Sequence, residues 1–132
     1  MSEPEFLTVD DVLLLHTEQL ARYGGGDGVR DPGALDAAVA MAQQSFGGEF
    51  VHSDLFAMAA AYAFHIAQNQ PFIDGNKRTG LLAALVFLDL NGIAIGDPDE
   101  RLYQALIDVA ARTLDKAGVA QLLRTLASHN TI

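Results

Sequence analysis

The chain has 132 residues, a formal net charge of -9 and no cysteine. This length fits one folded domain, residues 1–132, which buries roughly two thirds of the surface that the unfolded chain exposes. Eight Lys and Arg residues stand against seventeen Asp and Glu. This balance argues against nucleic acid as a partner, because binding to phosphate backbones needs clustered cations. Without cysteine, disulfides and thiolate metal sites are excluded, which is compatible with a reducing compartment.

Two features of the sequence bear on location. Met1 to Asp11 is acidic and lacks the basic segment and apolar run of a secretion signal. The longest apolar stretches are interrupted by polar residues well short of a membrane span. We therefore expect a soluble cytoplasmic protein with no membrane partner.

The predicted elements, in chain order, are all helices. The first begins at Thr8, whose hydroxyl is placed to form a capping box with Asp11, and it ends before a glycine-rich loop. A second runs from about Pro32 to Ser45, because Asp31 is a favoured cap and proline is favoured at the first helical position. Gly47-Gly48 ends this second helix.

The remaining segments predict the centre of the fold and its last two helices. Leu55 to Asn69 and Thr79 to Leu90 are apolar on every side, which is typical of buried helices. A fifth helix runs from Asp97 to about Leu114, and a sixth runs from Asp115 to near Ser128. The sequence thus predicts an all-α fold of about six helices around a buried central pair, which is joined by Gln70 to Arg78.

One helix start differs from the other five. Five starts carry a carboxylate, as expected where the helix dipole places about half a positive charge. The fourth helix instead begins with Asn76, Lys77 and Arg78, after Asp74 and Gly75. Two cations at a helix N-terminus are unfavourable unless an anion occupies that terminus.

These residues suit a phosphate. Free N–H groups, the flexible Gly75, and the side chains of Lys77 and Arg78 form an anion site of the kind that holds phosphates. Asp74 could hold a magnesium ion that bridges those phosphates. A simpler interpretation stays open, in which both cations are solvated side chains and Asp74 is an ordinary cap.

The same stretch resembles a family signature. Gln70-Pro71-Phe72-Ile73-Asp74-Gly75-Asn76-Lys77-Arg78-Thr79 is similar to the Fic/Doc signature, His-Pro-Phe-x-x-Gly-Asn followed by Gly-Arg or Lys-Arg, in its Asn-Lys-Arg-Thr form of the Doc branch. Arg22 to Gly25, Asp31 to Gly33 and Leu85 to Gly92 also look like Doc. The resemblance therefore covers nearly the whole chain.

The resemblance implies the fold and activity of the Doc branch, the toxins of bacterial toxin–antitoxin pairs. A Doc toxin uses ATP to phosphorylate a threonine of elongation factor Tu, which halts translation. The adenylylating Fic enzymes carry a further arginine three positions after Arg78, where this chain has Leu81. We therefore expect phosphate transfer, with AMP transfer as the alternative.

The resemblance also implies roles for single residues. Asp74 stands at the position that holds Mg²⁺, and Asn76 forms the anion hole with the amides beside Gly75. Lys77 and Arg78 stand where the family contacts the phosphates of the nucleotide. We also expect an antitoxin whose unfolded tail folds as a helix over Asp74 to Arg78 and blocks the nucleotide.

Gln70 stands where the family carries its general-base histidine. A glutamine amide can hydrogen-bond a hydroxyl but cannot take its proton, and general base catalysis contributes roughly 10²–10⁴ in rate. We therefore expect impaired catalysis, from either an inactivating substitution or a natural member whose task is binding. His65, five residues earlier, is expected to be a packed helix residue, and Phe72 is expected to pack inward and fix the loop.

Two further expectations concern other parts of the chain. Gln43 to Ser53 lies where family members have a flap that positions the target, although an ordinary surface connection is an equal alternative. The histidines share no metal-ligand spacing; they are His16, His52, His65 and His129.

Overall fold

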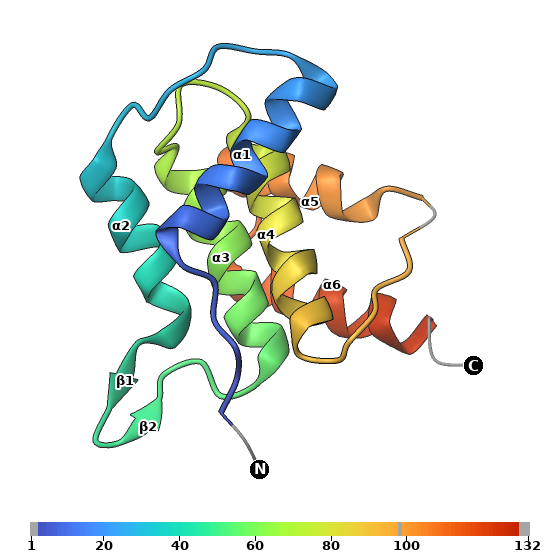
Figure 1. Ribbon diagram of the computed structural model, residues 1–132. Helices are drawn as coiled ribbons and strands as arrows, with labels where there is room; N and C mark the ends of the chain where they lie inside the picture. The colour runs from blue at the N-terminus through green and yellow to red at the C-terminus, as the bar shows by residue number, and fades with distance from the viewer. Residues whose placement is uncertain (1–2, 98, 130–132) are drawn as a thin grey trace.

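The computed structural model describes residues 3–97 and 99–129, and the described part of the chain is mostly helical (Figure 1). The predicted six helices are confirmed, with a small hairpin between the second and third. The helices are α1 Val9–Tyr23, α2 Pro32–Ala40, α3 Leu55–Asn69, α4 Asn76–Leu90, α5 Arg101–Ala110 and α6 Lys116–His129. The shorter elements are the 3₁₀ turn η1 Met41–Gln43 and the strands β1 Ser45–Phe46 and β2 Glu49–Phe50.

The predicted central pair is α3 and α4, which lie against each other in the middle of the molecule (Figure 1). Their contact surfaces are built from small side chains such as Ala63 and Ala84, both almost fully buried. A Cβ added to Gly80 of α4 would lie 2.9 Å from the carbonyl oxygen of Ala63 on α3. The close approach of the two helices therefore requires glycine at that position.

Five helix starts are capped by side-chain oxygens, as the sequence predicts. Thr8 and Asp11 form the capping box of α1. In the other four, an aspartate accepts from backbone N–H groups one turn into the helix. These aspartates are Asp31 on Ala34, Asp54 on Ala57, Asp97 on Arg101 and Leu102, and Asp115 on Gly118.

The predicted extension of the second helix to Ser45 is wrong. The α-helix ends at Ala40 and tightens into η1, after which Gln44 turns to extended backbone with ψ 134°. β1 and β2 then form an antiparallel hairpin. Gly47 and Gly48 make its turn at φ 61° and 86°. Positive φ at both central residues suits a two-residue hairpin loop. The prediction that this glycine pair ends the second helix is therefore wrong, because the helix ends earlier and the pair turns the hairpin.

The fifth helix is shorter than predicted at both ends. Asp97 does cap it, but the helix begins only at Arg101, after Glu100 adopts a left-handed conformation with φ 53°. It ends at Ala110, and Arg112 turns the chain with φ 63°. The carboxylate of Asp97 accepts from backbone N–H groups four and five residues further along the chain. The capping side chain therefore belongs to a residue before the N-cap position, whereas the sequence prediction placed the helix start at Asp97 itself.

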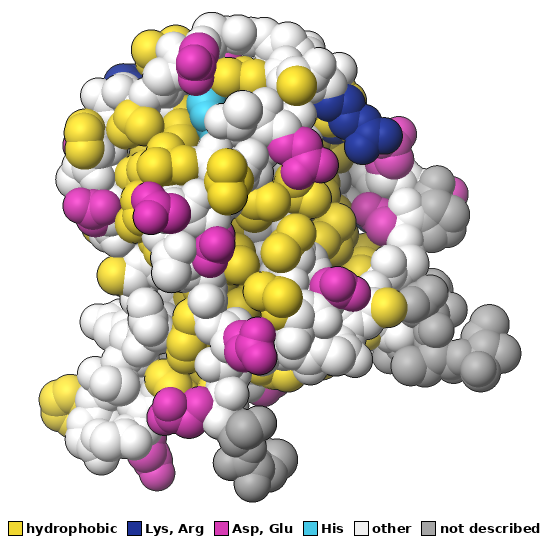
Figure 2. Space-filling view, viewed as in Figure 1, with side chains coloured by type: hydrophobic (Ala, Val, Ile, Leu, Met, Phe, Trp, Pro, Cys, Tyr) yellow, Lys and Arg dark blue, Asp and Glu magenta, His cyan; other side chains and the backbone are white. Residues whose placement is uncertain are grey.

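The surface matches the acidic composition. On the face shown in Figure 2, Asp and Glu side chains are spread among hydrophobic ones, and Lys and Arg side chains are few. Within the described residues, no helix is both long enough and apolar enough to cross a membrane.

Candidate functional site

The loop between α3 and α4 is fixed by the segment that follows α1. Arg30 donates from Nε to the carbonyl oxygen of Gln70 at 2.7 Å and from Nη2 to that of Asn69 at 2.8 Å. The backbone N–H of Arg30 donates to the carbonyl oxygen of Pro71 at 2.7 Å, and Val29 forms a bridge with Phe72. Both segments lie at the same end of the molecule (Figure 1). The loop therefore has a defined shape.

Phe72 anchors the middle of this loop. Its side chain is 1% exposed, and burial of a phenylalanine side chain contributes about 2–3 kcal/mol. The side chain of Asn76 hydrogen-bonds both backbone groups of Phe72. Its Oδ1 accepts from the Phe72 N–H and its Nδ2 donates to the Phe72 carbonyl, each at 3.0 Å. Phe72 thus packs inward and fixes the loop, as expected.

His16 of α1 supports the next part of the loop. Its ring stacks on Phe72 with centroids 3.8 Å apart and 6° between the planes. Its Nε2 lies 2.8 Å from the carbonyl oxygen of Asp74. Since a carbonyl only accepts, Nε2 carries the proton and donates. This bond sets the direction of the peptide that leads into α4.

The start of α4 has no side-chain cap. Gly75 occupies the N-cap position with φ 80°, a left-handed conformation that favours glycine. The N–H groups of Asn76, Lys77 and Arg78 have no acceptor within the described ranges, 3–97 and 99–129. Asp74 is therefore not an ordinary cap of α4, which removes the simpler interpretation of that residue. An unsatisfied helix N-terminus attracts anions.

A cleft of about 280 Å³ opens over this helix end. Asp74 forms one wall, and its Oδ2 accepts from the N–H of Gly26 at 2.7 Å. The guanidinium of Arg78 packs against the rings of Tyr23 and Tyr103, with Cζ 3.8 Å and 4.0 Å from their centroids. The lining comprises Tyr23, Gly24, Gly25, Asp74, Gly75, Asn76, Lys77, Arg78 and Tyr103.

The predicted site residues divide into two groups. Asp74, Gly75, Asn76, Lys77 and Arg78 all line the cleft. The side-chain amide of Asn76 is committed to Phe72, so its free contribution to the cleft is the backbone N–H. Gln70 does not line the cleft; it is exposed and adopts a left-handed conformation, φ 49° and ψ 58°, at the end of α3.

Comparison with known proteins identifies the family of this chain. The Fic/DOC family pattern matches residues 6–88, from α1 through most of α4. The chain belongs to the Fic/DOC family. It is 34% identical over 120 residues to the "Protein kinase doc" of Escherichia phage P1, covering 91% of this chain and 94% of that protein. It is 38% identical over 126 residues to the "Toxin Doc" of Mycolicibacterium smegmatis, covering 94% and 95%.

In this Fic/DOC chain, His65 is packed away from the cleft, as expected. The Lys116 ammonium lies 3.1 Å from Nε2 of His65, and because an ammonium only donates, Nε2 accepts and the proton resides on Nδ1. Burial, and then the charge of Lys116, lower the pKa of His65 to about 4. Burial likewise lowers the pKa of His52 and of Lys116.

Within the described part of the chain, no group of three or more His, Asp or Glu residues is arranged to hold a metal ion.

Several residues that shape the site were not predicted from the sequence. His16 was considered only as a metal ligand, and Arg30, Tyr23 and Tyr103 were not considered as site residues at all. They come from α1, α5 and the loop after α1, so no local spacing links them to the motif. Gly26 could have been found, since a glycine-rich loop next to a phosphate motif permits close backbone approach.

The hairpin lies far from the cleft. Phe50 borders a separate cleft together with Asp54 and Asn91, at the start of α3 and just after α4. The start of α4, over which the cleft described here opens, lies at the opposite end of α3 (Figure 1). With 15 residues, α3 is about 22 Å long. This separation favours an ordinary surface connection over a flap that positions a target.

Proposed function

We propose that this chain is a Doc-type protein phosphotransferase, the toxin of a toxin–antitoxin pair, which binds ATP at the start of α4. The observation that carries the proposal is an uncapped helix N-terminus, lined by two cations, in a chain similar along most of its length to a protein kinase Doc. Uncapped N–H groups and cationic side chains recognise phosphate groups.

The nucleotide phosphates fit the cleft by charge. The N–H groups at the start of α4 and the Arg78 guanidinium meet their oxygens. Asp74 also suits Mg²⁺ as a ligand. The Oδ1 atom of Asp74 has no hydrogen-bond partner within residues 3–97 and 99–129, and Mg²⁺ needs only one or two carboxylates when phosphates are present. When bound, Mg²⁺ supplies charge neutralisation at the phosphates. Asp74 holds it, and the N–H of Gly26 orients that carboxylate.

Gln70 limits catalysis. Transfer joins the hydroxyl oxygen of the target to the γ-phosphorus and breaks the bond between that phosphorus and the β–γ bridging oxygen, which leaves with ADP, while a base removes the hydroxyl proton. The amide of Gln70 orients the hydroxyl but leaves the proton in place. We expect transfer to be reduced roughly 10²–10⁴-fold compared with a version that has histidine at this position.

The left-handed backbone at position 70 accommodates histidine. Asn, Asp and His are enriched among non-glycine residues with positive φ, and the Arg30 bonds to the carbonyls of Asn69 and Gln70 do not involve the side chain at position 70. Gln70→His therefore restores a base without refolding the loop. A non-catalytic binding role is the alternative, and it is favoured by Gln70 itself.

AMP transfer is the second enzymatic candidate. It requires the α-phosphate rather than the γ-phosphate to face the target hydroxyl. Leu81 stands where the adenylylating Fic enzymes carry an arginine, which argues for γ-phosphate transfer.

The proposed partners follow from the same site. The protein substrate is a threonine-bearing translation factor, with elongation factor Tu as the first candidate. The antitoxin covers the start of α4 with a segment that folds on binding and displaces the nucleotide. A bound antitoxin fragment that left ATP affinity unchanged would overturn this form of inhibition.

The experiment is a transfer assay with elongation factor Tu, Mg²⁺ and ATP labelled at the γ- or α-phosphate, using the unaltered chain and Gln70→His. Transfer of γ label by Gln70→His, with little or none by the unaltered chain, is the expected result. Transfer of α label would establish AMP transfer instead. If neither version labels elongation factor Tu or any protein of a lysate, the enzymatic proposal fails and the binding role replaces it.

A further inference from the structure

The environment of Arg78 differs from that of Arg30 and Arg124, whose guanidinium groups donate to oxygen atoms. Arg30 uses its donors on the carbonyls of Asn69 and Gln70, and Arg124 forms an ion pair with Asp54 at 3.0 Å. Among the described residues, Arg78 has no carboxylate or carbonyl partner; its contacts are the two aromatic rings. Its charge is therefore held in place without being neutralised.

The two rings belong to different helices. Tyr23 ends α1, Tyr103 belongs to α5, and Arg78 lies in the first turn of α4. Cζ of Arg78 lies 3.8 Å and 4.0 Å from the two ring centroids, so both rings pack against the guanidinium. A guanidinium donates from its edge, within its own plane. No described residue accepts a hydrogen bond from these Arg78 donors, so they are available to a phosphate.

We propose that Tyr23 and Tyr103 are positioning residues that form an aromatic clamp on Arg78 and pre-order its guanidinium for the nucleotide phosphate. This inference rests on the proposed function and goes further, since it assigns a role to two residues outside the signature. An arginine that is free in solution loses rotamer freedom on binding, and a pre-ordered arginine avoids most of that loss. The ring faces carry this effect, so the tyrosine hydroxyls do not contribute to it.

The first measurement needs no ligand. The ¹⁵N and ¹H resonances of the Arg78 side-chain Nε–H report the ring currents of the two aromatic faces. We expect an Nε–H proton shifted upfield from the value of a free arginine. The shift moves toward the free value in Tyr103→Leu and in Tyr23→Leu, and it persists in Tyr103→Phe and Tyr23→Phe. A free-arginine shift in the unaltered chain would overturn the clamp, whatever the protein binds.

The second measurement is ATP affinity in the presence of Mg²⁺, by calorimetry. We expect each leucine variant to bind about three- to tenfold more weakly and each phenylalanine variant to stay within about twofold of the unaltered chain. In an Arg78→Ala background, the leucine substitutions add nothing further, because the clamp acts only through Arg78. Equal losses in both backgrounds, or phenylalanine variants as weak as the leucine variants, would overturn the positioning role.

A matched control separates the clamp from general packing. Arg124 lies over the ring of Phe56 with Cζ 5.9 Å from the centroid, at the start of α3. Phe56→Leu removes an aromatic ring from an arginine that is remote from the cleft, so it should leave ATP affinity unchanged. If the unaltered chain bound no ATP while the upfield Arg78 shift was present, the proposed function would fail and the clamp geometry would stand without its phosphate role.

Discussion

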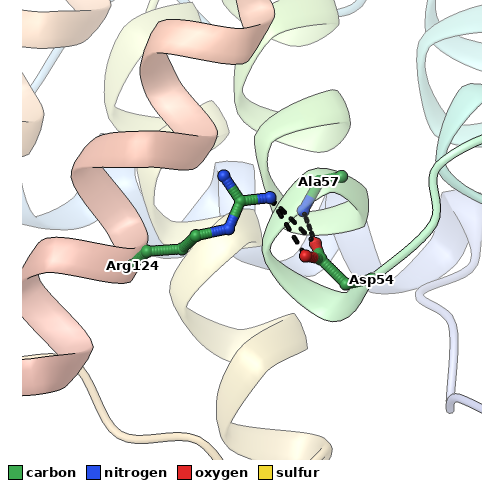
Figure 3. Close-up of polar contacts among 3 residues, drawn as sticks. All are labelled: Asp54, Ala57 and Arg124. Carbon is green, nitrogen blue, oxygen red and sulfur yellow. Dashed lines mark hydrogen bonds and ion pairs between the residues drawn. The ribbon is translucent and has the colours of Figure 1, made fainter.

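The starts of α3 and α4 show how one chain builds two kinds of helix N-terminus. At α3, Asp54 accepts from the N–H of Ala57 at 2.8 Å and pairs with Arg124 of α6 (Figure 3). At α4, the N-cap is Gly75, no side chain caps the helix, and the nearby cations approach no carboxylate among the described residues. The first terminus is satisfied by a side chain of the protein, whereas the second has no capping side chain among the described residues and leaves its N–H groups open to solvent or to an external anion.

The electrostatics of the α3 start agree with this contrast. Burial alone would raise the pKa of Asp54, but the Ala57 N–H and the Arg124 guanidinium outweigh it and lower the pKa. Because the folded-state pKa is depressed, the stabilisation from this carboxylate is present above its unfolded pKa. It is lost as the pH falls through the folded value.

The largest expected effect is the loss of Arg78. Arg78→Ala in the Gln70→His version should reduce γ-phosphate transfer about 100-fold or more, because a charge-assisted contact to the phosphate is removed. Arg124→Ala, at the satisfied terminus, should leave transfer within about twofold. The two variants are compared by their initial rates of γ-phosphate transfer at a fixed ATP concentration. Similar losses in the two variants would mean that the two helix starts do not differ in function.

The next prediction concerns a substitution that makes the start of α4 resemble the other helix starts, which carry a carboxylate. Lys77→Glu places a carboxylate in the first turn of α4, which should raise stability by about 0.3–1 kcal/mol through the helix dipole. The same change should weaken ATP binding by at least about tenfold, because a repulsive charge then faces the phosphates. Urea unfolding and calorimetry measure the two quantities. Retained ATP affinity would contradict an anion site at this terminus.

Asp54→Ala tests the satisfied terminus. Loss of the cap and of the partly exposed Arg124 pair should lower stability by about 1–2 kcal/mol at pH 7, with ATP affinity unchanged after correction for the folded fraction. The difference from the unaltered chain should shrink in acid as Asp54 becomes protonated. A stability loss that stayed constant down to pH 2 would show that the carboxylate charge is not what stabilises α3.

His65 should make stability depend on pH. Its pKa is about 4 in the folded state, below its unfolded value, so the unfolded chain binds the proton first as the pH falls. Stability from this group is thus full above about pH 6.5 and is lost between pH 6.5 and 4. Because His65 is only partly buried, and His52 and Lys116 titrate beside it, we expect a loss of about 1–2 kcal/mol. His65→Gln should remove most of this pH dependence of stability, measured as the urea unfolding midpoint at each pH. If the midpoints of the variant fell with pH as much as those of the unaltered chain, His65 would not be the source of the dependence.

The smallest effect concerns Thr79, a residue of the signature that faces the core. It is fully buried, and its Oγ1 has no hydrogen-bond partner among the residues that the structure describes. Thr79→Val removes an unsatisfied hydroxyl with little change in volume, so stability should rise by up to about 1 kcal/mol. ATP affinity should not change. A loss of stability would show that Oγ1 has a partner, for example a buried water.

The sequence predicts the features of this molecule that depend on local patterns. The aspartate caps, the apolar surfaces of α3 and α4, and the unusual start of α4 all lie within a few residues of the atoms they affect. The exact ends of α2 and α5 were wrong, because left-handed or extended residues such as Gln44 and Glu100 redirect the chain, and the short hairpin of β1 and β2 was not predicted.

The sequence does not reveal contacts that join distant segments. His16 reaches Asp74 across 58 positions, and Arg30 reaches Gln70 across 40. The ring of Tyr103 approaches Arg78 because α5 folds back over the start of α4. The local spacing of these residues does not predict such contacts, because the contacts depend on how the helices pack.

The most direct test of the central claim follows the backbone amides by ¹H–¹⁵N NMR while ATP and Mg²⁺ are added to the unaltered chain. Binding does not depend on the missing base, so Gln70 does not interfere. The account predicts that the largest shifts occur at Gly75, Asn76, Lys77 and Arg78, while the amides at the capped start of α3 do not move. Saturable shifts elsewhere with none at the start of α4, or no shifts at all, would contradict it.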